Sequence, residues 1–351
     1  MQIPKILTVP VTENATQTIK TVSSFEEIMK QIFEENQNVL WYAKTLDAFS
    51  TGTFNHSANV AFHLYNFLSK DNRYSEDEVK EWTTAALVHD AGKLTTPIDI
   101  LHSKEKFNDP AISNRNFEVM MRHSIDGYEV AKEYGFDKRS TFAIIAHHVD
   151  AKAIENGSQA GFKDATASRK TWEKSFGNGY VEQLLTEAGS WLTEKDKYAV
   201  EALTVIDAIE AMRSTERFYN QNKCIDWENI SKYHGNDAEK GALNKSIVEK
   251  TSKSVTYQNE FNELQSYKPN RIVRHLVSEM AKDFACNISK DKMEEIKNNP
   301  EYGEAFFKKN DKNGQFVIDL GNGEELVIPK KEDVPDLSAE VTIVNDEYEY
   351  E

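Results

Sequence analysis

The chain has 351 residues, of which 39% are hydrophobic and 28% charged, and its formal net charge is −16. This composition can fill a hydrophobic core and differs from that of a disordered chain. The acidic balance argues against a general DNA or RNA binder, whose surface should be basic. The apolar stretches are too short for a membrane span, so we expect neither DNA nor a membrane as partner.

The N-terminal sequence MQIPKILTVPVTENATQ lacks the basic start and apolar block of a secretory signal. The two cysteines, Cys224 and Cys286, are too few for a disulfide framework and suit a reducing compartment. We therefore expect a cytoplasmic protein. Residues 331–351 carry one lysine against eight acidic residues, a net charge of −7, and are predicted to form a solvated acidic tail.

Most of the chain is predicted as helix. Ser24 with Glu27, and Ser75 with Glu78, have the spacing of capping boxes, and Asp137 can cap a later helix. Helical periodicity predicts elements over residues 25–46, 54–68, 76–92, 113–134, 138–149 and 193–213.

The remaining segments carry weaker signals. Residues 149–180 are polar and glycine-containing, which predicts a long functional or mobile loop. After about residue 220 the helical pattern fades, apart from an amphipathic helix over 268–288. Residues 315–329 show the alternation of a β-hairpin, and 338–345 can add a strand.

The positions of the histidines and of two aspartates indicate a metal site. Taken singly, each residue has an ordinary explanation: Asp207 in its apolar helix can form a salt bridge, and His147 with His148 can simply end a helix. Adjacent helical residues point about 100° apart, so by helix geometry alone these two histidines cannot share a metal ion well but can serve two neighbouring ions. Imidazole and carboxylate groups from separate helices together favour a metal site in a bundle core. The candidates are His56, His89, Asp90, His123, His147, His148 and Asp207.

The string AALVHDAGKLTTPIDIL (85–101) resembles the signature of HD-domain phosphohydrolases, and more narrowly of HD-GYP cyclic-dinucleotide phosphodiesterases. Further landmarks follow the family order, and the resemblance covers about residues 45–220. These landmarks are FNHSANVAFHL (54–64), FEVMMRHSIDGYEV (117–130), IIAHHVD (144–150) and VIDAIEAMRSTERFY (205–219).

The chain also departs from that family pattern. Val149 stands where the family has a glutamate after its two histidines, and no Gly-Tyr-Pro triplet follows. GNGYV (177–181) looks like an altered triplet, displaced by the insertion at about 149–180. Gly52 occupies the place of a third-metal glutamate, so we predict two metal ions rather than three.

The resemblance implies a mainly α fold, an HD-domain helical bundle with a small C-terminal α+β appendage. We expect four regions. They are an N-terminal helical extension (1–44), a catalytic domain (45–225), a C-terminal helical region with a β-hairpin (226–330) and the acidic tail (331–351).

The resemblance further implies that His56, His89, Asp90 and Asp207 hold one ion, and that Asp90 bridges to a second ion held by three histidines. Those histidines are His123, His147 and His148. Mixed imidazole and carboxylate ligands suit iron or manganese, with zinc and nickel left open. Two such ions, about 3.5–4 Å apart, lower the pKa of a bridging water and clamp the phosphate oxygens.

Other polar residues are assigned with this chemistry. Lys93 and Asp90 are expected to be catalytic, with Lys93 neutralising charge on the phosphoryl group, although without the motif Lys93 reads as a solvated lysine. The expected substrate contacts are Arg217, Arg213, Arg122 and Lys104; for Arg122 and Arg213 surface ion pairs are an equal alternative.

The expected function is hydrolysis of a cyclic dinucleotide, cyclic di-GMP or cyclic GMP–AMP, to a linear or mononucleotide product. An HD-type nucleotide phosphohydrolase and a catalytically silent cyclic-dinucleotide sensor remain as alternatives. A homodimer is compatible with the sequence.

Overall fold

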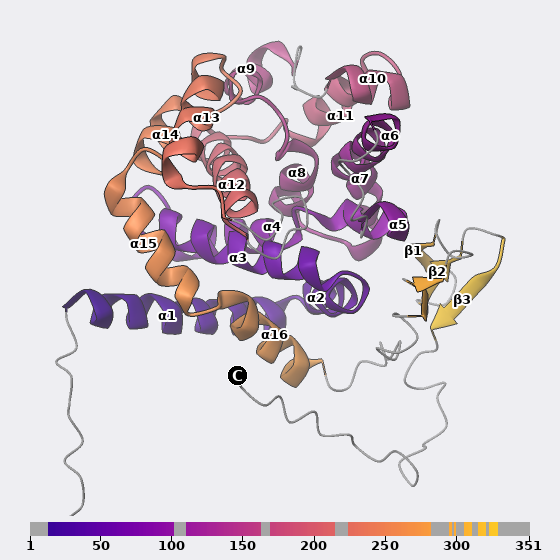
Figure 1. Ribbon diagram of the computed structural model, residues 1–351, viewed down its shortest axis with the longest axis horizontal. Helices are drawn as coiled ribbons and strands as arrows, with labels where there is room; N and C mark the ends of the chain where they lie inside the picture. The colour runs from indigo at the N-terminus through magenta and orange to yellow at the C-terminus, as the bar shows by residue number, and fades with distance from the viewer. Residues whose placement is uncertain are drawn as a thin grey trace, which may run out of the picture.

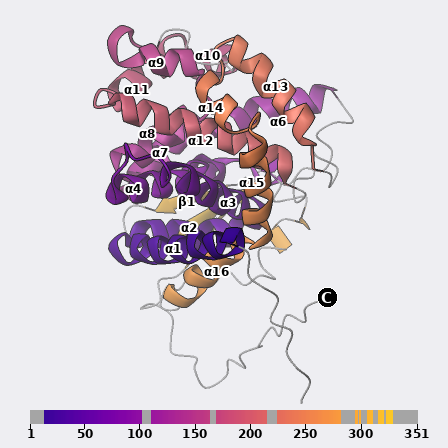
Figure 2. The same ribbon diagram turned by 90° about the vertical axis from the view of Figure 1, so that its left-hand side faces the viewer.

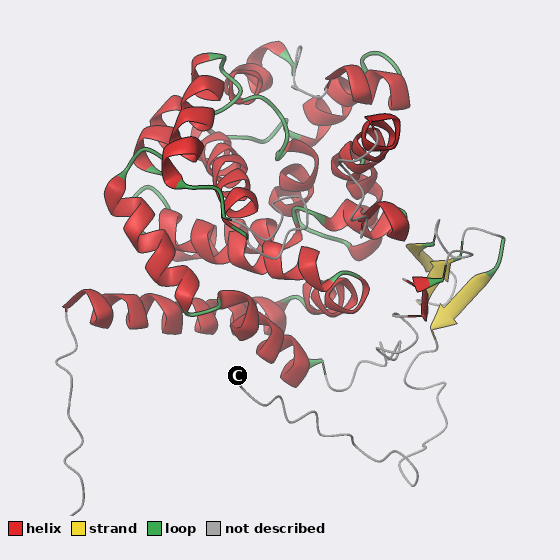
Figure 3. Cartoon of the chain, viewed as in Figure 1, coloured by secondary structure: helices red, strands yellow, loops and turns green. Residues whose placement is uncertain are grey.

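The computed structural model describes residues 13–101, 110–162, 169–214, 224–281, 295–296, 298–299, 305–310, 315–320 and 323–328. Helices make up most of this part of the chain, as Figure 3 shows, which confirms the mainly α prediction. None of the helices in these ranges has the length and apolar character needed to cross a membrane.

The helices form stacked layers (Figures 1 and 2). Together, α1, α2 and α16 form one outer layer, and α3 and α4 pack on it. Then come α7, α8 and α12, with α9 to α11 and α13 at the far side. The bounds of the elements in the first layers are α1 Glu13–Glu35, α2 Gln37–Phe49, α16 Pro269–Met280, α3 Thr51–Leu68 and α4 Glu76–Val88. Those of the central helices are α7 His123–Tyr134, α8 Lys138–Ala146 and α12 Glu194–Arg213.

Local sequence signals place several helix ends. Ser75 and Glu78 form the predicted capping box at the start of α4, with both reciprocal hydrogen bonds present. The Asp137 carboxylate accepts hydrogen bonds from the backbone of Arg139 and Ser140 at the start of α8. At the end of α7, Gly135 adopts φ 66°, a left-handed conformation that favours glycine.

The capping prediction at Ser24 is wrong. Because α1 begins at Glu13 and packs along α15 (Val255–Ser266) and α16, Ser24 lies inside the helix instead of at its start. The predicted helix over 25–46 is instead two helices. They are divided at Asn36, whose side chain accepts a hydrogen bond from the Val39 backbone and caps α2.

The helix predicted over 113–134 is also divided. It forms α6 (Pro110–Met121) and α7, with the break at Arg122. The break places His123 at the first residue of α7, where α7 packs against the short 3₁₀ helix η1 (Ala91–Thr95). The division therefore positions one of the predicted metal ligands.

The loop predicted over 149–180 is wrong, because this segment contains α9 (Ala151–Ala160) and α10 (Arg169–Phe176), followed by α11 (Tyr180–Ala188). The side chains of Ile154 and Trp172 are buried in the core. The apolar faces of these helices pack on α12 and α11, and this burial stabilises helices whose polar sequence suggests a loop.

The C-terminal region adds helices α13 (Trp227–Glu239), α14 (Lys245–Lys250) and α15, for which the sequence signal was weak. The amphipathic helix is confirmed as α16. A three-stranded antiparallel sheet follows in the order β1 (Phe306–Asn310), β2 (Gln315–Asp319) and β3 (Glu325–Ile328), and it lies at one side of the bundle (Figure 1).

The predicted hairpin is confirmed as β2 and β3, in which Val317 pairs with Val327. Strand β1 was not predicted. The strand expected over 338–345 and the tail over 331–351 lie outside the described residues, and the division into four regions stays a prediction.

Gly92, in η1, fixes a close approach to α7. A Cβ atom added at Gly92 would lie 1.8 Å from the carbonyl oxygen of His123 and 2.6 Å from the backbone nitrogen of Gly127. We expect Gly92→Ala to lower the unfolding free energy by about 1–3 kcal/mol, because the backbone must move apart. Thermal unfolding checks this prediction. Gly52→Ala is the matched control, since its Cβ would meet no atom within 4 Å.

Glu201, on α12, is a buried carboxyl group away from the histidines. Its Oε2 accepts a hydrogen bond of 2.7 Å from Asn244, and Oε1 has no partner within the described residues. Burial raises the pKa of Glu201 to about 8. The folded protein therefore holds this proton more tightly than the unfolded chain does, and stability should fall as the pH rises from the unfolded pKa of about 4.5 to about 8.

A substitution tests that linkage. In Glu201→Gln the group cannot ionise, so the melting temperature should depend less on pH between about pH 6 and about pH 9 than in the wild type. Glu249→Gln, at an exposed ion pair on α14, should leave the wild-type pH profile unchanged. If the melting temperatures of Glu201→Gln and the wild type depended on pH in the same way, the raised pKa of Glu201 would be contradicted.

Candidate metal centre

Seven predicted ligands come together from five helices. His56 lies on α3, Asp207 on α12, and His123 at the start of α7. The others lie where helices end: His89 and Asp90 directly follow α4, and His147 and His148 directly follow α8. The burial of this cluster is nearly complete, with the side chains of His148 and Asp207 partly exposed.

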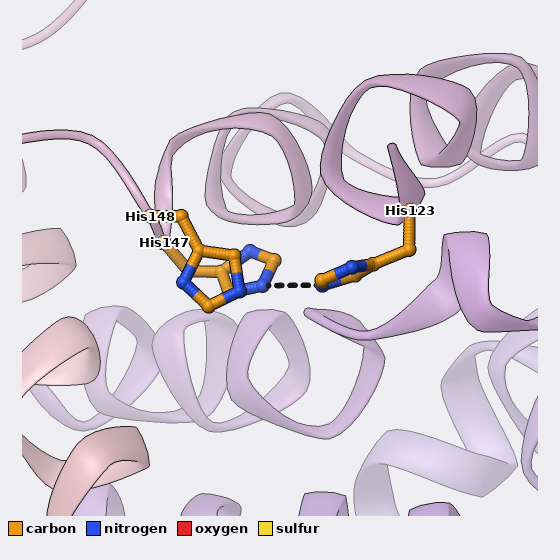
Figure 4. A group of neighbouring side chains, drawn as sticks. All are labelled: His123, His147 and His148. Carbon is orange, nitrogen blue, oxygen red and sulfur yellow. Dashed lines mark hydrogen bonds between the residues drawn. The ribbon is translucent and has the colours of Figure 1, made fainter. Parts of the chain in front are cut away.

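Two groups of ligand atoms face each other across Asp90. His56, His89 and Asp207 form one group, and His123, His147 and His148 the other, shown in Figure 4; within each group the ligand atoms lie within 4.8 Å of one another. The family resemblance assigns these residues to two ion sites, and the number of ions stays a prediction.

The Asp90 carboxylate lies between the groups. Its Oδ1 atom is 3.2 Å from Nε2 of His123 and 3.8 Å from Nε2 of His147. Its Oδ2 atom is 3.5 Å from Nε2 of His89 and 3.7 Å from Nε2 of His56. One oxygen therefore faces each group, which is the arrangement that a bridging carboxylate requires.

The imidazole rings are held through their Nδ1 atoms. Nδ1 of His89 is 2.7 Å from the Ala86 carbonyl oxygen, and Nδ1 of His147 is 2.8 Å from that of Ile144. His123 contacts the Met120 carbonyl in the same way. Since a carbonyl only accepts hydrogen bonds, each Nδ1 carries the proton and each Nε2 presents a lone pair.

These lone pairs fit a cation. Nε2 of His123 lies 3.0 Å from Nε2 of His147 (Figure 4), and two lone pairs at that distance repel unless a cation or a proton lies near both. The buried Nε2 of His89 has no hydrogen-bond partner in the described part of the chain. Bound divalent ions would satisfy these nitrogen atoms, so the side chains present fit the implied metals.

Burial and neighbouring charges shift the pKa values of several candidate ligands. Burial alone would raise the pKa of Asp90, but Lys93, His89 and His123 outweigh it and hold that pKa well below its usual range. Burial lowers the pKa of His148 to about 3, with a contribution from His123. Burial alone would lower the pKa of His89, but Asp90 and Asp207 outweigh it and raise that pKa above its usual range. Because only a neutral imidazole binds metal, a proton on His89 competes with the ion.

His147 and His148 both face His123, and His147 also forms a possible ligand group with His89 and Asp90. Whether the two histidines serve one ion or neighbouring ions stays a prediction. The expected separation of about 100° holds only inside a helix. Because α8 ends at Ala146, these residues follow turn geometry, and their rings lie 4.1 Å apart.

Lys93 reaches the centre from η1. Its Nζ atom lies 2.5 Å from Oδ2 of Asp90, and its side chain is 11% exposed. This position keeps one cationic group at the edge of the carboxylate cluster, within reach of an anion that approaches the ligands.

Glu210 is a functional candidate that sequence reasoning missed. Its carboxylate accepts a hydrogen bond from Nδ1 of His56 and another, of 2.9 Å, from Asn59. Nε2 of His56 in turn lies 2.8 Å from Oδ1 of Asp207. Glu210 lies in the same apolar stretch as Asp207, LTVIDAIEAM. A carboxylate at a buried helical position needs a partner, so the argument that identified Asp207 as a candidate also applied to Glu210.

Two of the predicted substrate-binding residues, Arg213 and Arg122, lie within the described residues, and both contact other groups of the protein. The guanidinium of Arg213 donates hydrogen bonds of 3.1 Å each to the Ile225 carbonyl and to Asn262, and it lies over the Trp227 ring. Arg122, next to His123, pairs with Asp126 at 3.3 Å and lies over the Phe176 ring. Arg217 and Lys104 lie outside the described residues.

Comparison with known proteins agrees with this geometry. Residues 53–212 match the family model of the HD domain. The matched segment is similar to the HD domain and covers less than half of the chain. This segment includes all seven candidate ligands as well as Lys93 and Glu210.

A stretch of 84 residues is 38% identical to the 3'3'-cGAMP-specific phosphodiesterase 1 of Vibrio cholerae serotype O1 (strain ATCC 39315 / El Tor Inaba N16961). The aligned stretch is 24% of this chain and spans 18% of the length of that relative. No solved structure matches the chain.

Proposed function

We propose that this HD-domain protein is a metal-dependent phosphohydrolase that opens the phosphodiester of a cyclic dinucleotide and yields a linear or mononucleotide product. The observation that carries the proposal is the Asp90 carboxylate placed between two groups of ligand atoms, with Lys93 beside it. The similarity to a 3'3'-cGAMP-specific phosphodiesterase favours cyclic GMP–AMP, and cyclic di-GMP is the second candidate substrate.

In this proposal His56, His89, Asp90 and Asp207 hold one divalent ion, and Asp90, His123, His147 and His148 hold the other. Iron or manganese suits these ligands best, with zinc or nickel as alternatives. Such ions supply Lewis acidity and activate water for attack on phosphorus.

The chain's own residues perform the remaining tasks. The backbone carbonyls of Ala86, Met120 and Ile144 orient three imidazoles so that Nε2 faces inward. Lys93 offers a positive charge to a phosphoryl oxygen or to the leaving group. Two ions and the two aspartates would leave the site at a charge of about +2 within a chain of net charge −16, which would concentrate an anionic substrate there.

Turnover tests the proposal. The protein is loaded anaerobically with manganese or ferrous iron and given cyclic GMP–AMP, cyclic di-GMP and a nucleoside triphosphate separately, and the products are resolved by chromatography. We expect linear or mononucleotide product from a cyclic dinucleotide, with loss of turnover after chelation. Hydrolysis of the triphosphate alone would favour a nucleotide phosphohydrolase. Tight binding of a cyclic dinucleotide without product would favour a silent sensor.

A further inference from the structure

A cavity lies away from the metal centre. Its volume is about 830 Å³, and it opens between the end of α3, the turn that follows, the first half of α12, α14 and α15. Asn66 lies ten residues after His56 on α3, and Tyr198 nine residues before Asp207 on α12. At 1.5 Å per residue, the cavity is about 15 Å along these helices from the candidate ligands. Its volume is typical of small-molecule sites.

The cavity presents cationic side chains from separate segments. Lys70, Arg73 and Lys250 line it together with Asp71 and Glu260, which gives the lining a net charge of +1 in a chain of net charge −16. Lys250 is exposed and its Nζ donates to the Tyr198 hydroxyl at 3.1 Å; among the described residues it forms no ion pair. This charge is available to an anionic ligand.

Arg73 is held in place rather than left free. Its Nε atom lies 2.9 Å and 3.0 Å from the two carboxylate oxygens of Asp71, and its guanidinium lies 4.2 Å from the centre of the Tyr198 ring. A guanidinium fixed by a carboxylate and an aromatic ring is preorganised, which lowers the entropy cost of binding a phosphate.

Aromatic and unpartnered polar groups line the same cavity. The Phe67 ring lies nearly parallel to that of Tyr198, at 6.3 Å, and meets the Tyr257 ring edge-on at 6.4 Å. Oδ1 of Asn66 and the hydroxyl of Tyr257 are buried, and neither has a hydrogen-bond partner in the part of the chain that the structure describes. Both atoms have almost no exposed surface, so a ligand N–H or O–H group would satisfy them only after the Asn66 or Tyr257 side chain turns toward the cavity.

We propose that this cavity binds a purine nucleoside diphosphate, at a site separate from the metal centre. The phosphates would lie at Lys70, Arg73 and Lys250, and the base would lie against Phe67, with its N–H groups toward Asn66. A phosphate-bearing ligand matches the cations, and a flat base with polar edges matches the aromatic wall and the buried acceptor.

Calorimetric titration of the full-length chain tests this site. The protein carries the substitution Asp90→Asn and is kept in a chelator, so that no ligand binds at the metal centre. The two ligands titrated are GDP and inorganic pyrophosphate. We expect one equivalent of GDP to bind about fivefold to 150-fold more tightly than pyrophosphate, because stacking of a base contributes about 1–3 kcal/mol.

Two substitutions and a control locate the binding. Lys250→Ala should lower the affinities for GDP and for pyrophosphate equally, by about fivefold to tenfold, because a charge-assisted phosphate contact is lost. Phe67→Leu should lower the affinity for GDP and leave the affinity for pyrophosphate unchanged. Lys245→Ala, on the same helix α14 but paired with Glu239 at 2.8 Å, should change neither affinity. Since Lys250 and Lys245 are exposed, both alanine variants should fold, which their melting temperatures check.

The proposal is overturned if GDP does not bind, if pyrophosphate binds as tightly as GDP, or if Lys250→Ala leaves the GDP affinity unchanged. These results are independent of turnover at the metal centre. A chain that hydrolyses no cyclic dinucleotide can still bind GDP in this cavity. Equally, a chain that does not bind GDP can still hydrolyse a cyclic dinucleotide.

Discussion

Asp90→Ala should abolish turnover, with a loss of roughly a thousandfold or more, because it removes a carboxylate that faces both groups of ligand atoms. The metal content should fall from about two ions per chain to one or fewer. Elemental analysis of the purified protein, together with the chromatographic assay, measures both effects.

The control for this variant is Asp237→Ala, which removes an exposed carboxylate that pairs with Lys240 on the surface. It should retain the metal content and the turnover of the wild type. An Asp90→Ala protein that still carries two ions and turns over substrate would show that Asp90 does not bridge the two groups, and the proposed arrangement of ligands would fail.

Glu210→Ala should weaken metal binding about 10-fold to 100-fold, which is the usual effect of removing a carboxylate that orients a histidine ligand. Glu210 contacts His56 and not the expected position of the ion, so it is a positioning residue. Without it, Nδ1 of His56 loses its acceptor and the ring loses its fixed orientation toward Asp207.

The conservative variant separates positioning from simple loss of stability. Glu210→Gln keeps an oxygen acceptor for His56 and should restore metal affinity to within a few-fold of the wild type. Metal titration at equilibrium measures the affinities, and thermal unfolding of the metal-free proteins measures stability. Equal metal affinities for Glu210→Ala and the wild type would contradict this role.

The sequence by itself determined the features that depend on neighbouring residues. The capping pair Ser75 and Glu78, the cap at Asp137 and the hairpin at 315–329 follow from hydrogen bonds and turn geometry within a few positions, and all three are present. The candidate ligands also carry local signals, because His and Asp at apolar helical positions need partners that a metal provides.

The tertiary structure alone decided the features that join distant segments. Glu210 lies 154 residues from His56, so no local pattern could pair them, and the break at Arg122 follows from the packing of α7 against η1. The segment predicted as a loop, residues 149–180, forms helices because its apolar side chains are buried against α11 and α12. The cavity beside Tyr198 likewise depends on how α14 and α15 pack on α3 and α12, because hydrophobic packing acts between segments that the sequence keeps apart.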